Sequence, residues 1–307
     1  MGSSNYDVII VGGGPAGLTA GLYTCRSRLK TALIEKMVVG GQVATTEFVE
    51  NYPGFKDGIM GAELIQHMEE QAKGFGLEIL FGEIEGVDIG EDQLKFVKFG
   101  EKELLCKALI IASGTRPNEL GIPGENALKG RGVSYCATCD GPFFKELDIA
   151  VIGGGDSAVE EAIFLTRYAK RVYIIHRRDK LRADKILQER AFNNEKIELV
   201  WDTVLDKITG SQTVEAIEVS NVKTKEVSKI EVGGVFMYVG LKPNTEFLKG
   251  LLSLDKRGFV ITDDEMKTSV PGIFAAGDVR VKLLRQIATA VGDGAIAAFV
   301  AEKYLEL

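Results

Sequence analysis

The chain has 307 residues, of which 45% are hydrophobic and 26% charged, a composition typical of a globular protein long enough for two domains. Its formal net charge of -7 argues against nucleic-acid binding, because a phosphate-binding surface needs an excess of lysine and arginine. The first residues show neither the basic region nor the long apolar region of a signal peptide, and no apolar run is long enough to span a membrane. We therefore expect a cytoplasmic protein that does not enter a membrane.

The chain begins with a strand, a glycine-rich turn and a helix. An apolar run over residues 6–11 is followed by Gly-Gly-Gly-Pro-Ala-Gly and then by a helical pattern to about residue 28. A second strand over residues 31–34 ends on Glu35, an acid placed where a ribose hydroxyl would bind. Because strand, turn, helix and acid coincide, the sequence predicts a dinucleotide site here.

Three glycines of this turn have separate roles in such a βαβ unit. Gly12 makes the tight turn, Gly14 lets a pyrophosphate approach the backbone, and Gly17 allows the helix to pack closely on the sheet. The amides at the helix N-terminus would then hold the phosphates.

Further elements follow before the next glycine turn. The pattern predicts an amphipathic helix over residues 63–74, short alternating strands over 78–99 and an apolar strand over 108–112.

A second βαβ unit repeats the first. A strand over residues 148–152 leads into a fingerprint that contains Gly153, Gly155 and Ala158, followed by a helix to about residue 168 and a strand over 172–175. Later segments read as strands and one long helix: 198–201, 204–208, 214–222, 235–239, the buried strand 272–278 and the helix 284–305. We therefore predict an α/β fold with two Rossmann-like units.

The residue at the end of the second strand indicates which nucleotide each unit binds. Glu35 would accept hydrogen bonds from a free ribose diol and would repel a 2′-phosphate. The second unit has His176, Arg177 and Arg178 at this point, with Arg182 close behind, and guanidinium groups suit a phosphate. These residues predict FAD in the first unit and NADPH in the second. The alternative, that the basic run is only a solvated face, stays open.

Two vicinal cysteines, Cys136 and Cys139, lie between the two fingerprints. A zinc site would need a second pair of ligands, yet Cys25 and Cys106 are isolated and the only histidines are His67 and His176, so we expect no metal site. A structural disulfide is disfavoured in a reducing compartment, and inert buried thiols are disfavoured by polar neighbours. The remaining interpretation is a redox pair that receives electrons from a flavin.

Such a dithiol needs a proton donor and acceptor close to its sulfur atoms. His67 lies in the amphipathic segment and is expected at the surface, while His176 belongs to the basic run. Asp140, next to Cys139, is therefore the local acid–base candidate, and it would need a raised pKa for that role. The alternative, that Asp140 is a turn residue ahead of Gly141, stays open. Cys25 and Cys106 are expected to be buried, unreactive side chains.

Several motifs complete the pattern in chain order: Gly12 to Gly17, Gly40-Gly41-Gln42, Glu50-Asn51-Tyr52-Pro53-Gly54, Cys136 to Gly141, Gly153 to Glu161, His176-Arg177-Arg178-Asp179 with Arg182-Ala183, and Gly277-Asp278 followed by Arg285-Gln286. Together they resemble the low-molecular-weight, bacterial-type thioredoxin reductases over nearly the whole chain.

The resemblance implies the class II pyridine nucleotide-disulfide oxidoreductase architecture, in which a discontinuous FAD domain contains an inserted NADPH domain. On this basis we predict an FAD domain over residues 1–115 and 244–307, and an NADPH domain with the redox cysteines over residues 116–243. It also implies a homodimer.

The resemblance further implies the roles of individual residues. Cys139 would face the flavin, Cys136 would attack the disulfide of thioredoxin, and Asp140 would donate a proton. Asp278 would bind the ribityl chain, and Arg285 and Gln286 would lie beside the isoalloxazine ring. Four other residues would complete the surroundings of the flavin: Gly41, Gln42, Asn51 and Gly277.

The predicted activity is NADPH-dependent thioredoxin-disulfide reduction, with hydride transfer to FAD, electron transfer to the Cys136–Cys139 disulfide and then thiol–disulfide exchange. A related flavoprotein that reduces another disulfide carrier, a ferredoxin-linked reductase and a dithiol oxidase are the alternatives within this class. A flavin-containing scaffold protein with a structural or metal-bound cysteine pair is the non-enzymatic alternative.

Overall fold

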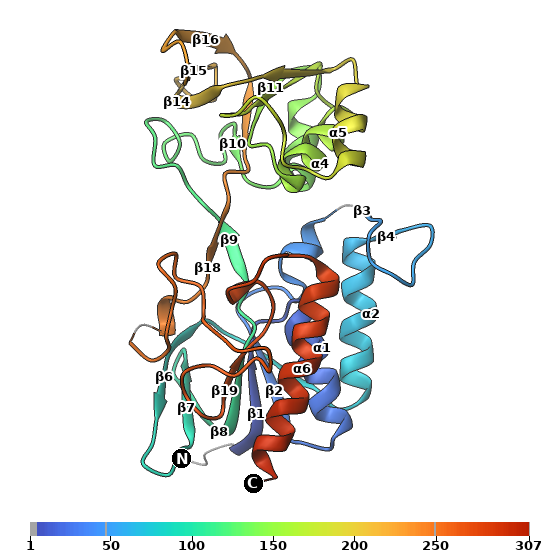
Figure 1. Cartoon of the computed structure of the whole chain (residues 1–307), viewed down its shortest axis with the longest axis vertical. Helices are drawn as coiled ribbons and strands as arrows, with labels where there is room; N and C mark the ends of the chain where they lie inside the picture. Colours follow the sequence, from blue (N-terminus) through green and yellow to red (C-terminus); the bar gives the residue numbers. More distant parts are fainter. Residues whose placement is uncertain (1–4, 47, 249, 307) are drawn as a thin grey trace. The chain divides into compact units, whose positions relative to one another are not determined.

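The computed structural model describes residues 5–46, 48–248 and 250–306. The chain forms two compact units (Figure 1): the first consists of Met1–Arg116 and Lys242–Leu307, and the second of Pro117–Leu241. The chain passes between the units in β9 (Thr115–Pro117) and again in β18 (Leu241–Pro243), and these two strands pair with each other. Each unit contains a sheet of mainly parallel strands with helices packed against it, which confirms the predicted α/β class.

The first unit is built on a seven-stranded sheet of order β5-β2-β1-β8-β7-β6, with β19 also paired to β8. The strands β5, β2, β1, β8 and β19 are parallel, and β7 and β6 form an antiparallel edge. Their bounds are β1 (Asn5–Val11), β2 (Thr31–Glu35), β5 (Glu78–Phe81), β6 (Ile84–Ile89), β7 (Lys95–Phe99), β8 (Lys102–Ile111) and β19 (Ile273–Ala275). A short antiparallel pair, β3 (Phe48–Val49) and β4 (Ile59–Met60), lies apart from this sheet.

Alternate residues of the central strands enter two different cores. Ile10 pairs with Leu33 and Ile110, and all three are fully buried with the helices on one face of the sheet. Their neighbours Ile9 and Ile111 enter the core on the other face. Because both faces are covered, each of these strands contains a run of consecutive apolar residues, as buried parallel strands generally do.

Three helices cover one face of this sheet (Figure 1): α1 (Pro15–Arg26), α2 (Gly61–Gly74) and α6 (Ile287–Leu305). The closest approach is between α1 and α6, where a Cβ on Gly294 would lie 2.2 Å from the carbonyl oxygen of Ala16. The C-terminal helix thus packs closely against α1, the helix that follows the first strand.

The second unit has a five-stranded parallel sheet of order β10-β17-β11-β12-β13 and a separate antiparallel sheet of order β14-β15-β16. The strands are β10 (Val133–Ser134), β11 (Asp148–Ile152), β12 (Arg171–Ile175), β13 (Ile197–Val200), β14 (Thr203–Thr209), β15 (Ala216–Asn221), β16 (Val227–Glu231) and β17 (Gly234–Met237). The helices are α3 (Ala137–Asp140), α4 (Asp156–Leu165) and α5 (Lys185–Phe192).

The predicted elements are present, with several different boundaries. Helix α1 ends at Arg26, because Arg28 takes a positive φ of 61° that ends the helical run. Helix α4 ends at Leu165, and the chain continues to Tyr168 in tighter turns. The buried strand predicted over 272–278 is shorter, since the chain leaves the sheet after β19 and forms the 3₁₀ turn η4 (Gly277–Val279).

Of the helices within the described ranges, none combines the length and the hydropathy that crossing a bilayer requires.

The packing of α1 on the sheet gives a direct test of the fold. A Cβ on Gly17 would lie 1.9 Å from the carbonyl oxygen of Gly12, whereas a Cβ on Gly74, at the end of α2, would meet nothing within 4 Å. We expect Gly17→Ala to destabilise the protein by about 3 kcal/mol or more, because backbone must move to admit the methyl group. Gly74→Ala should be neutral or slightly stabilising. Thermal unfolding of both variants checks this, and equal unfolding temperatures would contradict the packing described.

Candidate functional site

The first glycine turn connects β1 to α1 and leaves an open space at the helix N-terminus. Gly12 has a φ of 105°, and a Cβ there would lie 2.4 Å from the carbonyl oxygen of Ala112. Gly14 precedes the helix, and a Cβ built on it would meet no protein atom within 4 Å. The turn is therefore tight where it faces the sheet and open at the helix N-terminus, where free amides can receive a phosphate.

Glu35 lies at the end of β2, next to this turn. Its Oε2 atom accepts a hydrogen bond of 2.8 Å from the Gly13 amide, and its Oε1 atom accepts one of 3.1 Å from the Met37 amide. A carboxylate can accept about four hydrogen bonds. The two backbone amides thus orient Glu35 and leave capacity for the hydroxyl groups of a ribose.

The segment after β2 turns back onto the same region. The Gly40 amide donates to the carbonyl oxygen of Gly13 at 2.8 Å, and a Cβ on Gly41 would lie 3.6 Å from the Cα of Gly14. Gly41 and Gln42 begin the 3₁₀ helix η1 (Gly41–Thr45).

Two amide side chains tie this region to distant parts of the first unit. Gln42 donates through Nε2 to the carbonyl oxygen and hydroxyl of Thr115, at 3.0 and 2.8 Å. Asn51 donates through Nδ2 to Oε1 of Gln286 at 3.2 Å. The fold thereby brings predicted residues that are far apart in sequence to one end of α1 and α6.

The turn after β19 reaches the same helix end from the C-terminal part of the chain. Gly277 has a φ of 76°, and a Cβ on it would lie 2.9 Å from the Cβ of Ala16 in the first turn of α1. The next residue, Asp278, has a buried Oδ1 atom that makes no hydrogen bond within the described part of the chain. Burial raises the pKa of Asp278, and the nearby cations Lys282 and Arg285 act in the opposite direction. A buried acceptor without a partner, beside an open helix N-terminus, fits a ligand that donates hydroxyl groups.

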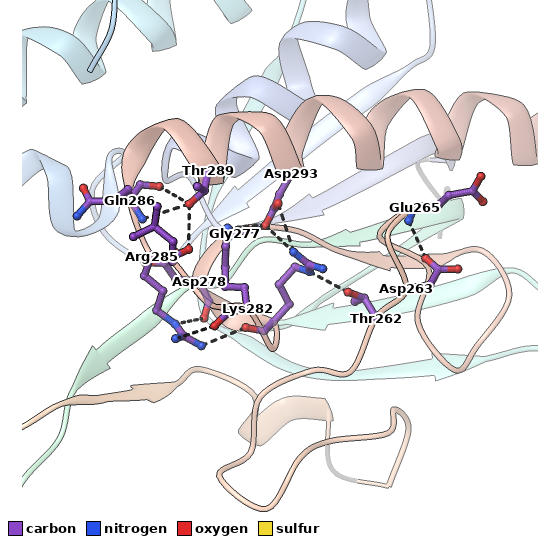
Figure 2. Close-up of polar contacts among 12 residues, drawn as sticks. Thr262, Asp263, Glu265, Gly277, Asp278, Lys282, Arg285, Gln286, Thr289 and Asp293 are labelled. Carbon is purple, nitrogen blue, oxygen red and sulfur yellow. Dashed lines mark hydrogen bonds and ion pairs between the residues drawn. The ribbon is translucent and has the colours of Figure 1, made fainter. Parts of the chain in front are cut away.

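Arg285 holds the chain that follows this turn. Its guanidinium group donates to the carbonyl oxygens of Asp278, Lys282 and Arg280, at 3.4, 3.4 and 3.2 Å (Figure 2). It also lies over the ring of Phe259, with 4.2 Å between Cζ and the ring centroid. Burial lowers the pKa of Arg285.

The second glycine turn connects β11 to α4 and has the same character. A Cβ on Gly153 would lie 2.5 Å from the carbonyl oxygen of Tyr238 and 2.7 Å from the buried Ala158. Gly155 precedes α4, and the nearest atom to a Cβ there would be Nη2 of Arg182, at 3.8 Å. This helix N-terminus is therefore open too, with a guanidinium group beside it.

The structure separates His176 from the arginines that follow it. His176 is buried, and a Cβ on Gly154 would lie 2.4 Å from its Nδ1 atom. Its Nε2 atom is buried without a hydrogen-bond partner in the described ranges. Burial lowers the pKa of His176, and the charges of Arg182 and Arg178 lower it further. His176 is thus a neutral ring at neutral pH, while Arg177, Arg178 and Arg182 are exposed cations.

The two vicinal cysteines are joined by a disulfide bond, with 5.4 Å between the Cα atoms of Cys136 and Cys139. Cys136 caps the short helix α3, and its Sγ atom accepts a hydrogen bond of 3.2 Å from the Cys139 amide. The Thr138 hydroxyl lies 3.4 Å from the same sulfur. Both of these contacts are to the sulfur of Cys136, and they would stabilise negative charge on it.

Asp140 is held by a residue that sequence reasoning missed. The buried Ser134 donates a hydrogen bond of 2.7 Å to Oδ2 of Asp140, while the Cys136 amide donates to the Ser134 hydroxyl at 3.1 Å. The available signal was a serine two positions before Cys136.

Tyr238 is a second missed residue. Its hydroxyl accepts a hydrogen bond of 3.1 Å from the Ala137 amide, between the two cysteines in sequence. Burial raises the pKa of Tyr238, and the charges of Glu161 and Asp140 raise it further. Tyr238 follows β17, 101 positions from Ala137, and no local pattern marks it.

The other cysteines are buried and apart from this pair, as predicted. Burial raises the pKa of Cys25, and it raises that of Cys106 to about 12, so neither is a thiolate at neutral pH. His67 is exposed, also as predicted. Within the described ranges, no group of three or more histidine, cysteine, aspartate or glutamate side chains could hold a metal ion.

Comparisons with known proteins agree with this arrangement. The family model described as pyridine nucleotide-disulphide oxidoreductase matches residues 6–294. The thioredoxin reductase of Peptoclostridium litorale is 50% identical over 307 residues, which cover 98% of this chain and 97% of that protein. That of Listeria monocytogenes is 52% identical over 303 residues, covering 98% and 94%.

A solved structure extends this similarity to the fold. The crystal structure of thioredoxin reductase from Lactococcus lactis shares 51% identity and a TM-score of 0.96, and the match covers 98% of this chain and 100% of that one. The chain therefore belongs to the pyridine nucleotide-disulphide oxidoreductases and, within them, to the thioredoxin reductase family.

Proposed function

We propose that this chain is an NADPH-dependent flavoenzyme that reduces the disulfide of a thioredoxin through FAD and its own Cys136–Cys139 pair. The observation that carries the proposal is the disulfide itself, which joins the N-cap residue of α3 to a residue inside that helix, in the unit that also contains the second glycine turn. Neither cysteine is fully buried, which a pair that exchanges with another protein requires.

FAD would lie with its pyrophosphate at the open N-terminus of α1, and when bound it would supply two-electron transfer between NADPH and the disulfide. Gly12, Gly14 and Gly17 would admit its pyrophosphate, and Glu35 would bind a ribose diol. The unpartnered oxygen of Asp278 would accept a hydrogen bond from a hydroxyl group of the ribityl chain. The remaining residues proposed around the flavin are Gly41, Gln42, Asn51, Gly277, Arg285 and Gln286.

NADPH would lie at the open N-terminus of α4. Gly153, Gly155 and Ala158 form the turn that would receive its pyrophosphate, and Arg177, Arg178 and Arg182 offer the guanidinium groups for its 2′-phosphate. We propose a different role for His176: a neutral ring packed on Gly154 would position the turn and could offer Nε2 to the nucleotide without adding charge.

The cysteine chemistry uses the contacts around Cys136. Two electrons break the Cys136–Cys139 bond, and two protons complete a pair of thiols. Deprotonated Cys136 would attack the disulfide of thioredoxin and form a mixed disulfide, while one thioredoxin sulfur leaves as a thiolate. Cys139 would then attack the sulfur of Cys136, which re-forms the internal disulfide and releases the second thioredoxin thiolate. We assign to Asp140, oriented by Ser134, the transfer of protons at these sulfur atoms.

The homodimer and the cytoplasmic location stay predictions. Light scattering of the purified holoprotein measures the first, and cell fractionation measures the second.

The arginine assignment predicts a preference for NADPH over NADH. In an anaerobic titration, NADPH should bleach the flavin absorbance of the oxidised protein at much lower concentration than NADH. The double variant Arg177→Gln with Arg178→Gln should raise the KM for NADPH about tenfold or more, because each lost charge-assisted contact costs about 1.5–3 kcal/mol. The KM for NADH should stay nearly unchanged.

Arg171→Gln is the matched control, because Arg171 is an exposed arginine at the opposite end of β12, where it pairs with Glu198. No bleaching by either nucleotide, with full bleaching by dithionite, would reject NADPH as the electron donor and favour the ferredoxin-linked or dithiol-oxidase alternative.

The open space at Gly14 predicts a separation of flavin binding from stability. Gly14 has φ -74° and ψ -177°, which alanine adopts readily, so Gly14→Ala should leave the unfolding temperature of the apoprotein close to that of the wild type. The added methyl group would occupy the space assigned to the pyrophosphate, and we expect the Kd for FAD to rise about tenfold or more. Fluorescence titration of apoprotein measures this, with Gly74→Ala as control. An unchanged Kd would place the flavin elsewhere.

The Ser134–Asp140 hydrogen bond predicts non-additive variants. Ser134→Ala should slow dithiol exchange with thioredoxin about tenfold, since a hydrogen bond to a charged group contributes about 1.5–3 kcal/mol, and Ser134→Thr should retain most of the rate. Because Ser134 acts through Asp140, adding Ser134→Ala to Asp140→Asn should slow the reaction no further. Stopped-flow flavin absorbance measures these rates, and additive losses would show that Ser134 acts independently of Asp140.

A further inference from the structure

Asp293 is a buried carboxylate on α6 that no part of the proposed chemistry uses. It is 8% exposed, and its Oδ2 atom accepts hydrogen bonds from the Gly277 amide at 3.0 Å and from Nζ of Lys282 at 2.8 Å (Figure 2). Nη1 of Arg280 lies 3.3 Å from both of its oxygens. All three partners come from one segment, residues 277–286, which we call the flavin-side loop.

The charges in this cluster are buried together. The side chains of Arg280 and Lys282 are only 12% and 7% exposed, so Asp293 is the ion-pair partner of two desolvated cations. Thr262 accepts a further hydrogen bond from Nε of Arg280 at 2.8 Å. Removing one member of a buried ion pair leaves an uncompensated charge, which is far more costly than losing an exposed pair.

Helix α6, which carries Asp293, is joined to both ends of the flavin-side loop. The loop begins at Gly277, whose amide donates a hydrogen bond to Asp293. It ends at Gln286, which caps α6 through reciprocal hydrogen bonds with Thr289. Asp293 follows Gln286 by seven positions, or about two helical turns, so it lies on the same side of α6 as the cap. The loop is thus held to one helix at its start, at its middle and at its end.

Several residues of this loop are among those proposed to bind FAD. Asp278, with its unpartnered oxygen, directly follows the bonded Gly277, and Arg285 directly precedes Gln286. Lys282 is the cation that most strongly opposes the burial-induced rise in the pKa of Asp278, and it is itself paired with Asp293. A displacement of Asp293 would therefore change both the position and the charge environment of Asp278.

We propose that Asp293 is a positioning residue for flavin binding: it anchors Gly277 and compensates Arg280 and Lys282, so that Asp278 and Arg285 are held ready for FAD. This inference rests on the proposed function, because it takes the flavin to lie at this loop. Asp293 acts through the loop and not by contact with the ligand, since three protein groups already occupy most of the roughly four acceptor positions of its carboxylate.

The test compares two substitutions on the same helix. Asp293→Asn keeps an oxygen for the Gly277 amide but removes the charge that pairs with Arg280 and Lys282, and we expect the Kd of the apoprotein for FAD to rise about tenfold or more. Glu302→Gln is the matched control, because Glu302 accepts a hydrogen bond of 2.8 Å from Ser27 and lies away from the loop on α6. Its Kd should equal that of the wild type. FAD fluorescence titration provides the values, and circular dichroism of each apoprotein at the same temperature reports its folding.

The outcomes distinguish the two levels of the proposal. A folded Asp293→Asn variant with a lowered unfolding temperature and a wild-type Kd would overturn the inference and leave Asp293 a purely structural residue. If Asp293→Asn does not fold, Lys282→Met replaces it, because this variant keeps the bonds of Asp293 to Gly277 and Arg280. We expect its Kd for FAD to rise threefold or more, and a wild-type Kd would overturn the inference. Wild-type apoprotein that fails to bind FAD would instead overturn the flavin site itself.

Discussion

The first turn of α1 is the point at which the first unit is assembled, and it depends on backbone approaching backbone without intervening side chains. A Cβ on Gly17 would lie 1.9 Å from the Gly12 carbonyl, one on Gly294 would lie 2.2 Å from the Ala16 carbonyl, and one on Gly277 would lie 2.9 Å from the Ala16 methyl group. These glycines belong to β1–α1, to α6 and to the turn after β19. Close packing at these glycines joins the two sequence segments of this unit. The same absence of side chains leaves the N-terminus of α1 open, and that opening is the proposed flavin site.

The two glycine turns show how one topology can accept different nucleotides. In the first unit, the residue at the end of the second strand is an acid, and Glu35 binds the Gly13 amide. In the second, the equivalent residue is the neutral ring of His176, packed on Gly154, and exposed arginines follow it. A carboxylate suits a free ribose diol and repels a phosphate, whereas a neutral ring with guanidinium groups nearby tolerates the additional dianion. The difference is one of charge at a shared position.

The cysteine pair depends on a different type of support. Side-chain hydrogen bonds from neighbouring strands hold the short helix. Ser134, at the end of β10, donates a hydrogen bond to Asp140, and the hydroxyl of Tyr238, just after β17, accepts one from the Ala137 amide. A four-residue helix has no stability of its own, so its geometry comes from these contacts. The conformation of the redox pair is thus set by the sheet beside it.

The sequence by itself determined the features whose signals are local. Strand, glycine turn and helix are encoded within about 30 residues, and the Cys136–Cys139 spacing is read directly from the chain, so both βαβ units and the disulfide pair could be predicted. Only the tertiary structure decided which distant residues contact these units and the cysteine pair. The burial of His176, the contact between Tyr238 and Ala137, and the ion cluster at Asp293 join groups that are separate in sequence. No periodicity records such contacts, because a buried hydrogen bond or ion pair is fixed by where the sheets and helices place the two partners, and not by the residues that flank them.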